Sequence, residues 1–139
     1  MIVADANLIA YLLLPGQRTK EAEDVFAKDS VWAVPVLCRS ELRSVLLQYV
    51  RAGDLPLADA IRTMLRGEGL LAGREADIDS RRVLELAAGS RCSSYDCEYV
   101  ALAEVLRVPL VTNDGPVLKA FPAIALSPRA FLESVAGAG

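Results

Sequence analysis

Short apolar segments alternate with longer amphipathic segments along this sequence, and this alternation limits the possible folds more than any other feature does. Apolar runs predict strands over residues 2–4, 31–34, 109–112 and 123–126. Helical periodicity predicts helices over residues 7–14, 20–28, 36–52, 57–66, 80–88, 93–106 and 128–135. Such alternation predicts an α/β fold with a mainly parallel sheet and helices on both faces. Residues 70–78 are compatible with either a further short strand or an extended connection.

The chain has 139 residues, and we predict that residues 1–139 form a single domain. Its residues are 53% hydrophobic, but no uninterrupted apolar run is long enough to span a membrane. The first predicted strand begins at residue 2, which leaves no room for a cleavable signal peptide. We therefore expect a soluble cytoplasmic protein without a membrane partner, and we expect residues 137–139 to be frayed.

The sequence contains no histidine, and its three cysteines form no CxxC pair. The missing histidine excludes Ser-His-Asp and Cys-His catalysis as well as histidine-ligated zinc. Three thiols without histidine are too few for a tetrahedral zinc site. The expected chemistry therefore depends on other side chains, and carboxylates are the best candidates.

Two acidic residues directly follow predicted strands. Asp5 comes after the first strand, and Asp114 comes after the strand that ends at Thr112. Because the carboxyl ends of parallel strands lie along one edge of a sheet, both side chains are expected at that edge. Asp114 also lies in the sequence Asn-Asp-Gly-Pro, which is typical of a turn, so a structural role is an alternative.

Two further acids lie on helix faces that are otherwise apolar. Glu41 shares a predicted face with Cys38 and Leu42, and Asp96 lies in the first turn of the helix over residues 93–106. Glu41 could instead pair with an arginine at the edge of its apolar stripe. Asp96 and Ser93 also match the Ser-x-x-Asp pattern of a capping box, which is a structural alternative.

Four carboxylates in one small volume raise one another's pKa values unless a cation compensates them. A ligand set with oxygen atoms alone, without histidine or thiolate, selects Mg²⁺ or Mn²⁺. Such an ion activates water and neutralises phosphoryl charge. Metal-assisted hydrolysis of a phosphodiester is therefore the hypothesis that these residues favour.

Four segments in this order resemble the PIN-domain family, and within it the small VapC-type toxins: VADAN, SELRSVLL, YDCEYVALAEVL and PLVTND. The resemblance implies a three-layer α/β/α fold with a central, mainly parallel sheet of about five strands. It implies that four acids bind the metal and catalyse the reaction, namely Asp5, Glu41, Asp96 and Asp114. Asn7 and Thr112 match the polar positions that support these acids.

By the same resemblance, the chain would be an Mg²⁺- or Mn²⁺-dependent endoribonuclease that cuts transfer or ribosomal RNA. It would act as the toxin of a type II toxin-antitoxin pair, form a homodimer, and be neutralised by a VapB-type antitoxin. Some relatives carry another acid shortly after the fourth one, but Val117 and Leu118 occupy that region here. A second tightly held metal is therefore not supported.

The net charge of −3 argues against a broadly basic RNA-binding surface. RNA would have to be held by local arginines, and those nearest to the acids in sequence are Arg39, Arg43, Arg81, Arg82 and Arg91. Two alternatives remain open: a PIN-fold ribonuclease of RNA processing outside a toxin-antitoxin pair, and a non-catalytic PIN scaffold that binds proteins. A dinucleotide-binding domain is excluded because no glycine-rich turn follows the first strand.

Overall fold

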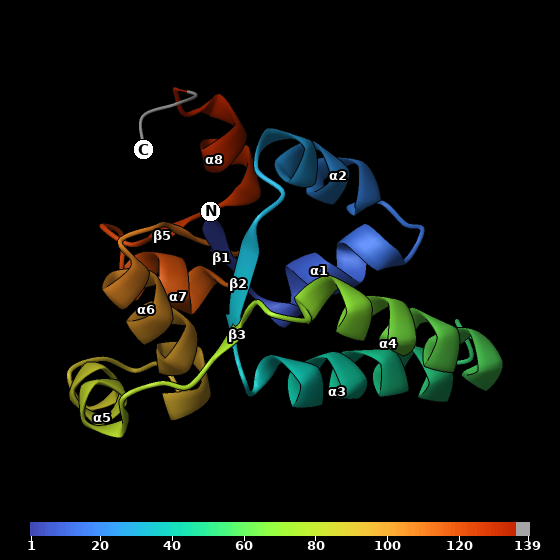
Figure 1. Ribbon diagram of the computed structural model, residues 1–139, viewed down its shortest axis with the longest axis horizontal. Coiled ribbons are helices and arrows are strands. Elements are labelled where there is room, and N and C mark those ends of the chain that lie inside the picture. The colour runs from blue at the N-terminus through green and yellow to red at the C-terminus, as the bar shows by residue number, and fades with distance from the viewer. Residues whose placement is uncertain (136–139) are drawn as a thin grey trace.

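In the computed structural model, which describes residues 1–135, five short strands form one parallel sheet (Figure 1). The strand order is β3-β2-β1-β4-β5. β1 (Ile2–Ala4) lies at the centre, between β2 (Trp32–Pro35) and β4 (Leu110–Val111). β3 (Glu75–Ala76) and β5 (Ala125–Leu126) form the two edges. The predicted parallel α/β fold is confirmed.

The central strand is apolar at every position because both of its faces are covered. Ile2, Val3 and Ala4 are fully buried, and Val3 pairs in register with Leu110 on one side. On the other side, Ile2 pairs with Trp32. A continuous apolar run of this kind is typical of a strand in the middle of a parallel sheet.

Three helices cover one face of the sheet. α6 (Ser94–Leu106) lies across β1, β2 and β4, and α5 (Ser80–Ala88) packs against the outer side of α6. α7 (Gly115–Ala120) packs beside β5. Figure 1 shows these three helices together on one side of the strands.

The remaining helices gather on the opposite side of the sheet and at one end of it (Figure 1). α1 (Ala6–Leu13) packs against α3 (Cys38–Arg51), and α4 (Leu57–Leu71) contacts α3, α1 and β2. α2 (Thr19–Lys28) lies between α1 and α8 (Pro128–Glu133). The result is the expected three-layer arrangement.

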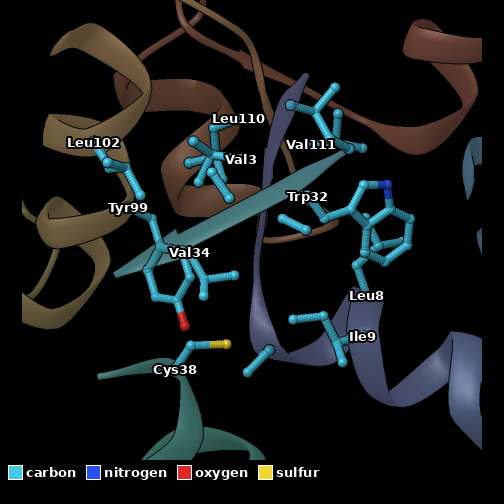
Figure 2. Close-up of a cluster of buried hydrophobic side chains, with 14 of the residues drawn as sticks. Val3, Leu8, Ile9, Trp32, Val34, Cys38, Tyr99, Leu102, Leu110 and Val111 are labelled. Atoms are coloured by element: carbon cyan, nitrogen blue, oxygen red, sulfur yellow. The ribbon is translucent and has the colours of Figure 1, made fainter. Parts of the chain in front are cut away.

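Both helical layers contribute to one buried core around the strands. Leu8 and Ile9 from α1 and Leu102 from α6 join Trp32 and Val34 of β2 (Figure 2). Each of these side chains is at most 2% exposed.

The helix predicted over residues 57–66 is longer than expected, since α4 continues to Leu71. Gly67, which lies just beyond the predicted end, is inside the helix and is buried. A Cβ atom at Gly67 would lie 2.7 Å from Leu42 Cδ2 and 3.3 Å from Leu13 Cδ1. The missing side chain therefore allows α4 to approach α3 and α1 closely. The helix ends before Gly73, which has a φ of +77°.

Three further observations complete the comparison with the predicted elements. The segment over residues 70–78 contains β3, a two-residue strand, and α7 follows Asp114 where no helix was predicted. The expected frayed residues 137–139 lie outside the described part of the chain. Within residues 1–135, none of the helices combines the length and the apolarity that crossing a membrane requires.

Candidate active site

The end of β1 and the start of α1 hold Asp5 at the carboxyl edge of the sheet. Asp5 is the N-cap of α1, and its Oδ1 accepts a hydrogen bond of 2.8 Å from the Leu8 amide. Its Oδ2 accepts a hydrogen bond from the Thr112 hydroxyl, which follows β4. The carboxylate is therefore oriented by the first turn of α1 and by the residue that follows β4.

Thr112 also positions the residue that follows β4. Its Oγ1 accepts a hydrogen bond of 3.0 Å from the Asp114 amide. Asp114 is in turn the N-cap of α7, and its Oδ1 accepts a hydrogen bond of 3.0 Å from the Val117 amide. The buried threonine hydroxyl thus connects the two acids that end β1 and β4.

Asp96 reaches the same edge from the first turn of α6. The Asp96 amide donates to Ser93 Oγ at 3.0 Å, and the Ser93 amide donates to Asp96 Oδ2 at 3.4 Å. The predicted capping box is therefore present. It does not exclude a second role, because the side chain of Asp96 also lines the pocket described next.

All four predicted acids line one pocket of about 250 Å³ at the carboxyl edge of the sheet. Asn7 and Thr112, the two predicted supporting residues, line it as well. Among the described residues that line this pocket there is no lysine or arginine. The sequence analysis missed three polar residues of the lining, which are Ser44, Gln48 and Tyr99. Spacing from Glu41 could have identified Ser44 and Gln48, since they lie three and seven positions further along α3.

Burial and neighbouring carboxylates raise the pKa values of two of the pocket acids, Asp5 and Glu41. Burial raises the pKa of Asp5, and the negative charges of Asp114 and Asp96 raise it further, against the hydrogen bonds from Thr112 and Leu8. Burial likewise raises the pKa of Glu41, with smaller contributions from Asp96 and Asp5. Burial is the largest cause of both shifts, and the nearby carboxylates act in the same direction, so a bound cation would favour the charged forms of both acids.

Tyr99 and Cys38 are buried neighbours of Glu41. The Tyr99 hydroxyl is buried and makes no well-formed hydrogen bond with any residue in the described range 1–135. Burial, followed by the neighbouring Cys38 and Glu41, raises the pKa of Tyr99, so that the phenol is neutral. Burial also raises the pKa of Cys38 to about 12, which keeps it a thiol. Figure 2 shows the Tyr99 hydroxyl close to Cys38.

The donor set fits a hydrated divalent cation. Among the described residues that line the pocket, every side-chain atom that could bind a metal is an oxygen, and negative charge without a basic neighbour favours a hard ion. Within residues 1–135, no three acidic or cysteine side chains form a closed set of metal ligands. Mg²⁺ needs no such set, because it keeps several waters and uses one or two carboxylates of the protein.

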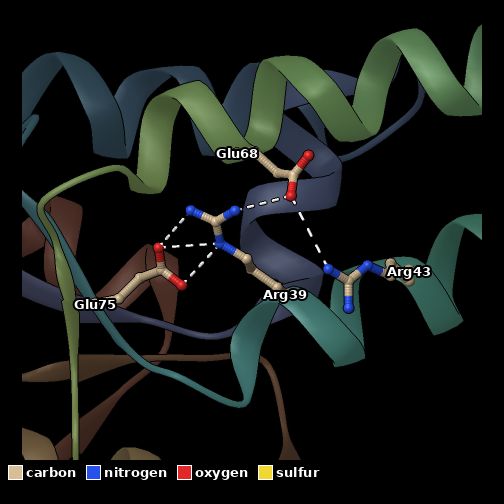
Figure 3. Close-up of polar contacts among 4 residues, drawn as sticks. All are labelled: Arg39, Arg43, Glu68 and Glu75. Carbon is tan, nitrogen blue, oxygen red and sulfur yellow. Dashed lines mark hydrogen bonds and ion pairs between the residues drawn. The ribbon is translucent and has the colours of Figure 1, made fainter.

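The five arginines predicted to hold RNA do not line the pocket. Arg39 donates to Glu75 at 2.6 Å and to Glu68 at 2.8 Å, and Arg43 lies 4.0 Å from Glu68 (Figure 3). This ion-pair network joins α3 and α4 to the edge strand β3.

The other three predicted arginines lie on or near α5. Arg82 forms a bidentate pair with Glu104 of α6, and Arg81 lies 4.0 Å from Glu85. Arg91 is exposed, and within residues 1–135 it has no carboxylate partner. Of the five, Arg91 is therefore the one whose guanidinium is not held by a neighbouring acid.

Comparisons with known proteins agree with this geometry. Residues 2–120 match the model of the PIN domain family. Ribonuclease VapC9 of Mycobacterium tuberculosis is 36% identical over 116 residues, which cover 82% of this chain and 86% of that protein. Ribonuclease VapC3 of Pyrobaculum aerophilum is 29% identical over 128 residues, which cover 88% and 96% of the two chains.

Solved structures show the same fold. The crystal structure of PAE2754 from Pyrobaculum aerophilum superimposes with a TM-score of 0.74 at 20% identity, covering 94% of this chain and 92% of that one. FitAcB from Neisseria gonorrhoeae gives a TM-score of 0.68 at 19% identity, covering 93% and 99%. On the family match and the 36% identity, the chain belongs to the PIN-domain family and is a relative of the VapC proteins.

Proposed function

We propose that the chain is an endoribonuclease that depends on Mg²⁺ or Mn²⁺ and hydrolyses phosphodiester bonds in RNA. The observation that carries this proposal is the pocket with four carboxylates and no basic residue among its described lining. The names of the relatives support the reaction class, since VapC9 and VapC3 are both called ribonucleases. Transfer RNA or ribosomal RNA is the proposed substrate.

Asp5, Glu41, Asp96 and Asp114 would hold the ion, directly or through its waters. A bound Mg²⁺ or Mn²⁺ would lower the pKa of a water molecule and would place positive charge near the phosphoryl oxygens. The protein orients the carboxylates: the Leu8 amide and the Thr112 hydroxyl both donate hydrogen bonds to the Asp5 carboxylate.

Two polar side chains at the pocket complete the proposed site. Asn7 on α1 and Gln48 on α3 place amide groups along its wall. An amide N–H can donate to a phosphate oxygen without adding charge to the metal site. We propose that these two residues position the RNA backbone while the carboxylates hold the ion.

We also propose that the protein is the toxin of a toxin-antitoxin pair, that a VapB-type antitoxin inhibits it, and that it acts as a homodimer. One structure with this fold is described as a toxin-antitoxin complex from Klebsiella pneumoniae, with a TM-score of 0.64. FitAB, which shares the fold at a TM-score of 0.68, was solved bound to an IR36 DNA fragment. These neighbours support a partner protein for this chain.

The test is cleavage of total transfer RNA and ribosomal RNA by the purified protein with Mn²⁺, Mg²⁺ or EDTA. Asp96→Asn removes one pocket charge, and Glu98→Gln is the matched control, because Glu98 is on the same helix but does not line the acidic pocket. We expect wild type and Glu98→Gln to cut RNA with metal and not with EDTA, and Asp96→Asn to lose cutting. Equal cutting by all three proteins, or cutting that persists in EDTA, would refute the proposal.

A further inference from the structure

A second hollow is lined by residues of α1 and α3, two of the helices that also line the acidic pocket. It has a volume of about 330 Å³, and its lining includes Tyr11, Leu14, Arg18, Thr19 and Tyr49. These residues come from the end of α1, the connection to α2, and the second half of α3. The proposed catalytic chemistry uses none of them.

The connection between α1 and α2 is held in a defined shape. The Thr19 hydroxyl donates to the Leu14 carbonyl, and the Thr19 amide donates to the Gly16 carbonyl at 3.3 Å. The Leu14 amide still donates to the Ala10 carbonyl of α1 at 2.9 Å. The hollow is therefore preformed by hydrogen bonds of the backbone and of Thr19.

Arg18 is an exposed cation in this hollow, and it stacks on an aromatic ring. Its Cζ lies 5.5 Å from the centre of the Tyr11 ring, which is the range of a cation–π contact. No acidic residue lines the hollow, and within residues 1–135 no carboxylate forms an ion pair with Arg18. By contrast, glutamates hold Arg39 and Arg82. The outer face of the Arg18 guanidinium is thus available to a ligand.

Helical spacing connects this hollow to the acidic pocket. On α1, Asn7 lines the pocket and Tyr11, four positions later, lines the hollow. On α3, Glu41 and Val45 line the pocket, and Tyr49 continues the same four-residue spacing into the hollow. The eight residues from Glu41 to Tyr49 correspond to about 12 Å at 1.5 Å per residue. Because α1 packs against α3, the pocket and the hollow lie in succession on one helix pair.

We propose that this hollow binds an unpaired nucleobase of the RNA substrate, stacked on the guanidinium of Arg18 and bounded by Tyr49. The inference rests on the proposed ribonuclease function and adds a specificity site to it. Proteins that read single-stranded RNA stack bases on aromatic rings and on arginine planes, and they combine this stacking with positive charge. The RNA would run from the acidic pocket along α1 and α3.

RNA is favoured over a peptide as the occupant because of the lining. Two tyrosines and one arginine without an acidic partner supply stacking and positive charge, which suit a base and its phosphate. The hollow is also next to a pocket that is proposed to act on phosphodiesters. A segment of the antitoxin is the competing occupant, and the experiment distinguishes the two.

The test measures binding of a fluorescently labelled, unstructured RNA 12-mer of mixed sequence. All variants are made in the Asp96→Asn background, which is expected not to cleave the RNA during the measurement. Arg18→Lys keeps the charge but loses the plane, and Tyr49→Leu loses the ring. Arg107→Gln is the control for charge, since Arg107 follows α6 and lines a different hollow. We expect Arg18→Lys and Tyr49→Leu each to weaken binding by roughly 5- to 150-fold, the effect of losing one base stack. Arg107→Gln should bind nearly as tightly as the background protein.

Cleavage by the same substitutions in the otherwise wild-type protein is measured in parallel. Arg18→Lys should raise KM and leave kcat unchanged, because the base stack is remote from the reacting phosphate. If the wild type cleaves RNA but Arg18→Lys and Tyr49→Leu bind RNA normally, the inference is wrong and the proposed function stands. If these two variants bind RNA normally but lose affinity for the antitoxin, the hollow is a peptide site. If the wild type neither binds nor cleaves RNA, both the function and the inference are refuted.

Discussion

Replacement of Thr112 by valine should destabilise the protein, because the Thr112 hydroxyl connects two of the pocket acids. Thr112 is 2% exposed, and its hydroxyl donates to Asp5 and accepts from the Asp114 amide. Valine has nearly the same shape but offers neither a donor nor an acceptor. The change therefore leaves a carboxylate and an amide without their partner.

The size of the effect follows from these two hydrogen bonds. A hydrogen bond to a charged group contributes about 1.5–3 kcal/mol, and one between neutral groups contributes about 0.5–1.5 kcal/mol. We expect Thr112→Val to lower the free energy of unfolding by about 2–4 kcal/mol. Thr112→Ser keeps the hydroxyl and loses one methyl group, which costs about 0.8 kcal/mol.

Urea denaturation in EDTA, followed by circular dichroism, measures both variants against wild type. A common m-value would show that the midpoints report stability and not a change in compactness. The valine variant should unfold at clearly lower urea concentration than the serine variant. If Thr112→Val were as stable as Thr112→Ser, the hydroxyl would not hold the two acids as described.

Three other predictions concern the capping box, the pocket charges and the buried thiol. Ser93→Ala should cost about 1 kcal/mol in urea denaturation, because it removes the acceptor of the Asp96 amide, and Ser94→Ala should cost much less; equal losses would contradict this role. Because the pKa values of Asp5 and Glu41 are raised in the folded state, the metal-free protein gains stability as these groups take up protons. In EDTA, the stability of Asp5→Asn relative to wild type should therefore be highest at pH 8 and should fall as the pH falls toward the unfolded values near 4; a difference between the two proteins that stays constant with pH would refute the explanation. Cys38, with a pKa of about 12, should resist iodoacetamide at pH 8 in the native protein and react after unfolding, as mass spectrometry would show; rapid labelling of the native protein would contradict its burial.

The sequence predicts the elements whose signals are local. A buried apolar run identifies β1, and the Ser93–Asp96 pattern identifies the start of α6. The rule that parallel strands end at one edge correctly brings Asp5 and Asp114 to one pocket. Local patterns therefore predict both the fold class and the four acids that line the pocket.

Features that depend on packing between distant segments could not be predicted. α4 continues past Gly67, where the missing side chain lets the helix approach Leu42 and Leu13. No local pattern in the sequence reveals that contact. β3 has two residues and, among the strands of residues 1–135, pairs with β2 alone, so it has no periodicity to detect. The partners of Arg39 lie 29 and 36 positions away in the chain, which explains why proximity to Glu41 in sequence did not reveal its ion pairs.

The central claim is that the four carboxylates act together as one site for a divalent cation. Calorimetric titration of Mn²⁺ into wild type, Asp5→Asn, Asp96→Asn and Glu98→Gln tests it most directly. The account predicts that wild type and Glu98→Gln bind Mn²⁺ alike and that both aspartate variants lose most of their affinity. Equal binding by all four proteins, or no binding by wild type, would contradict it.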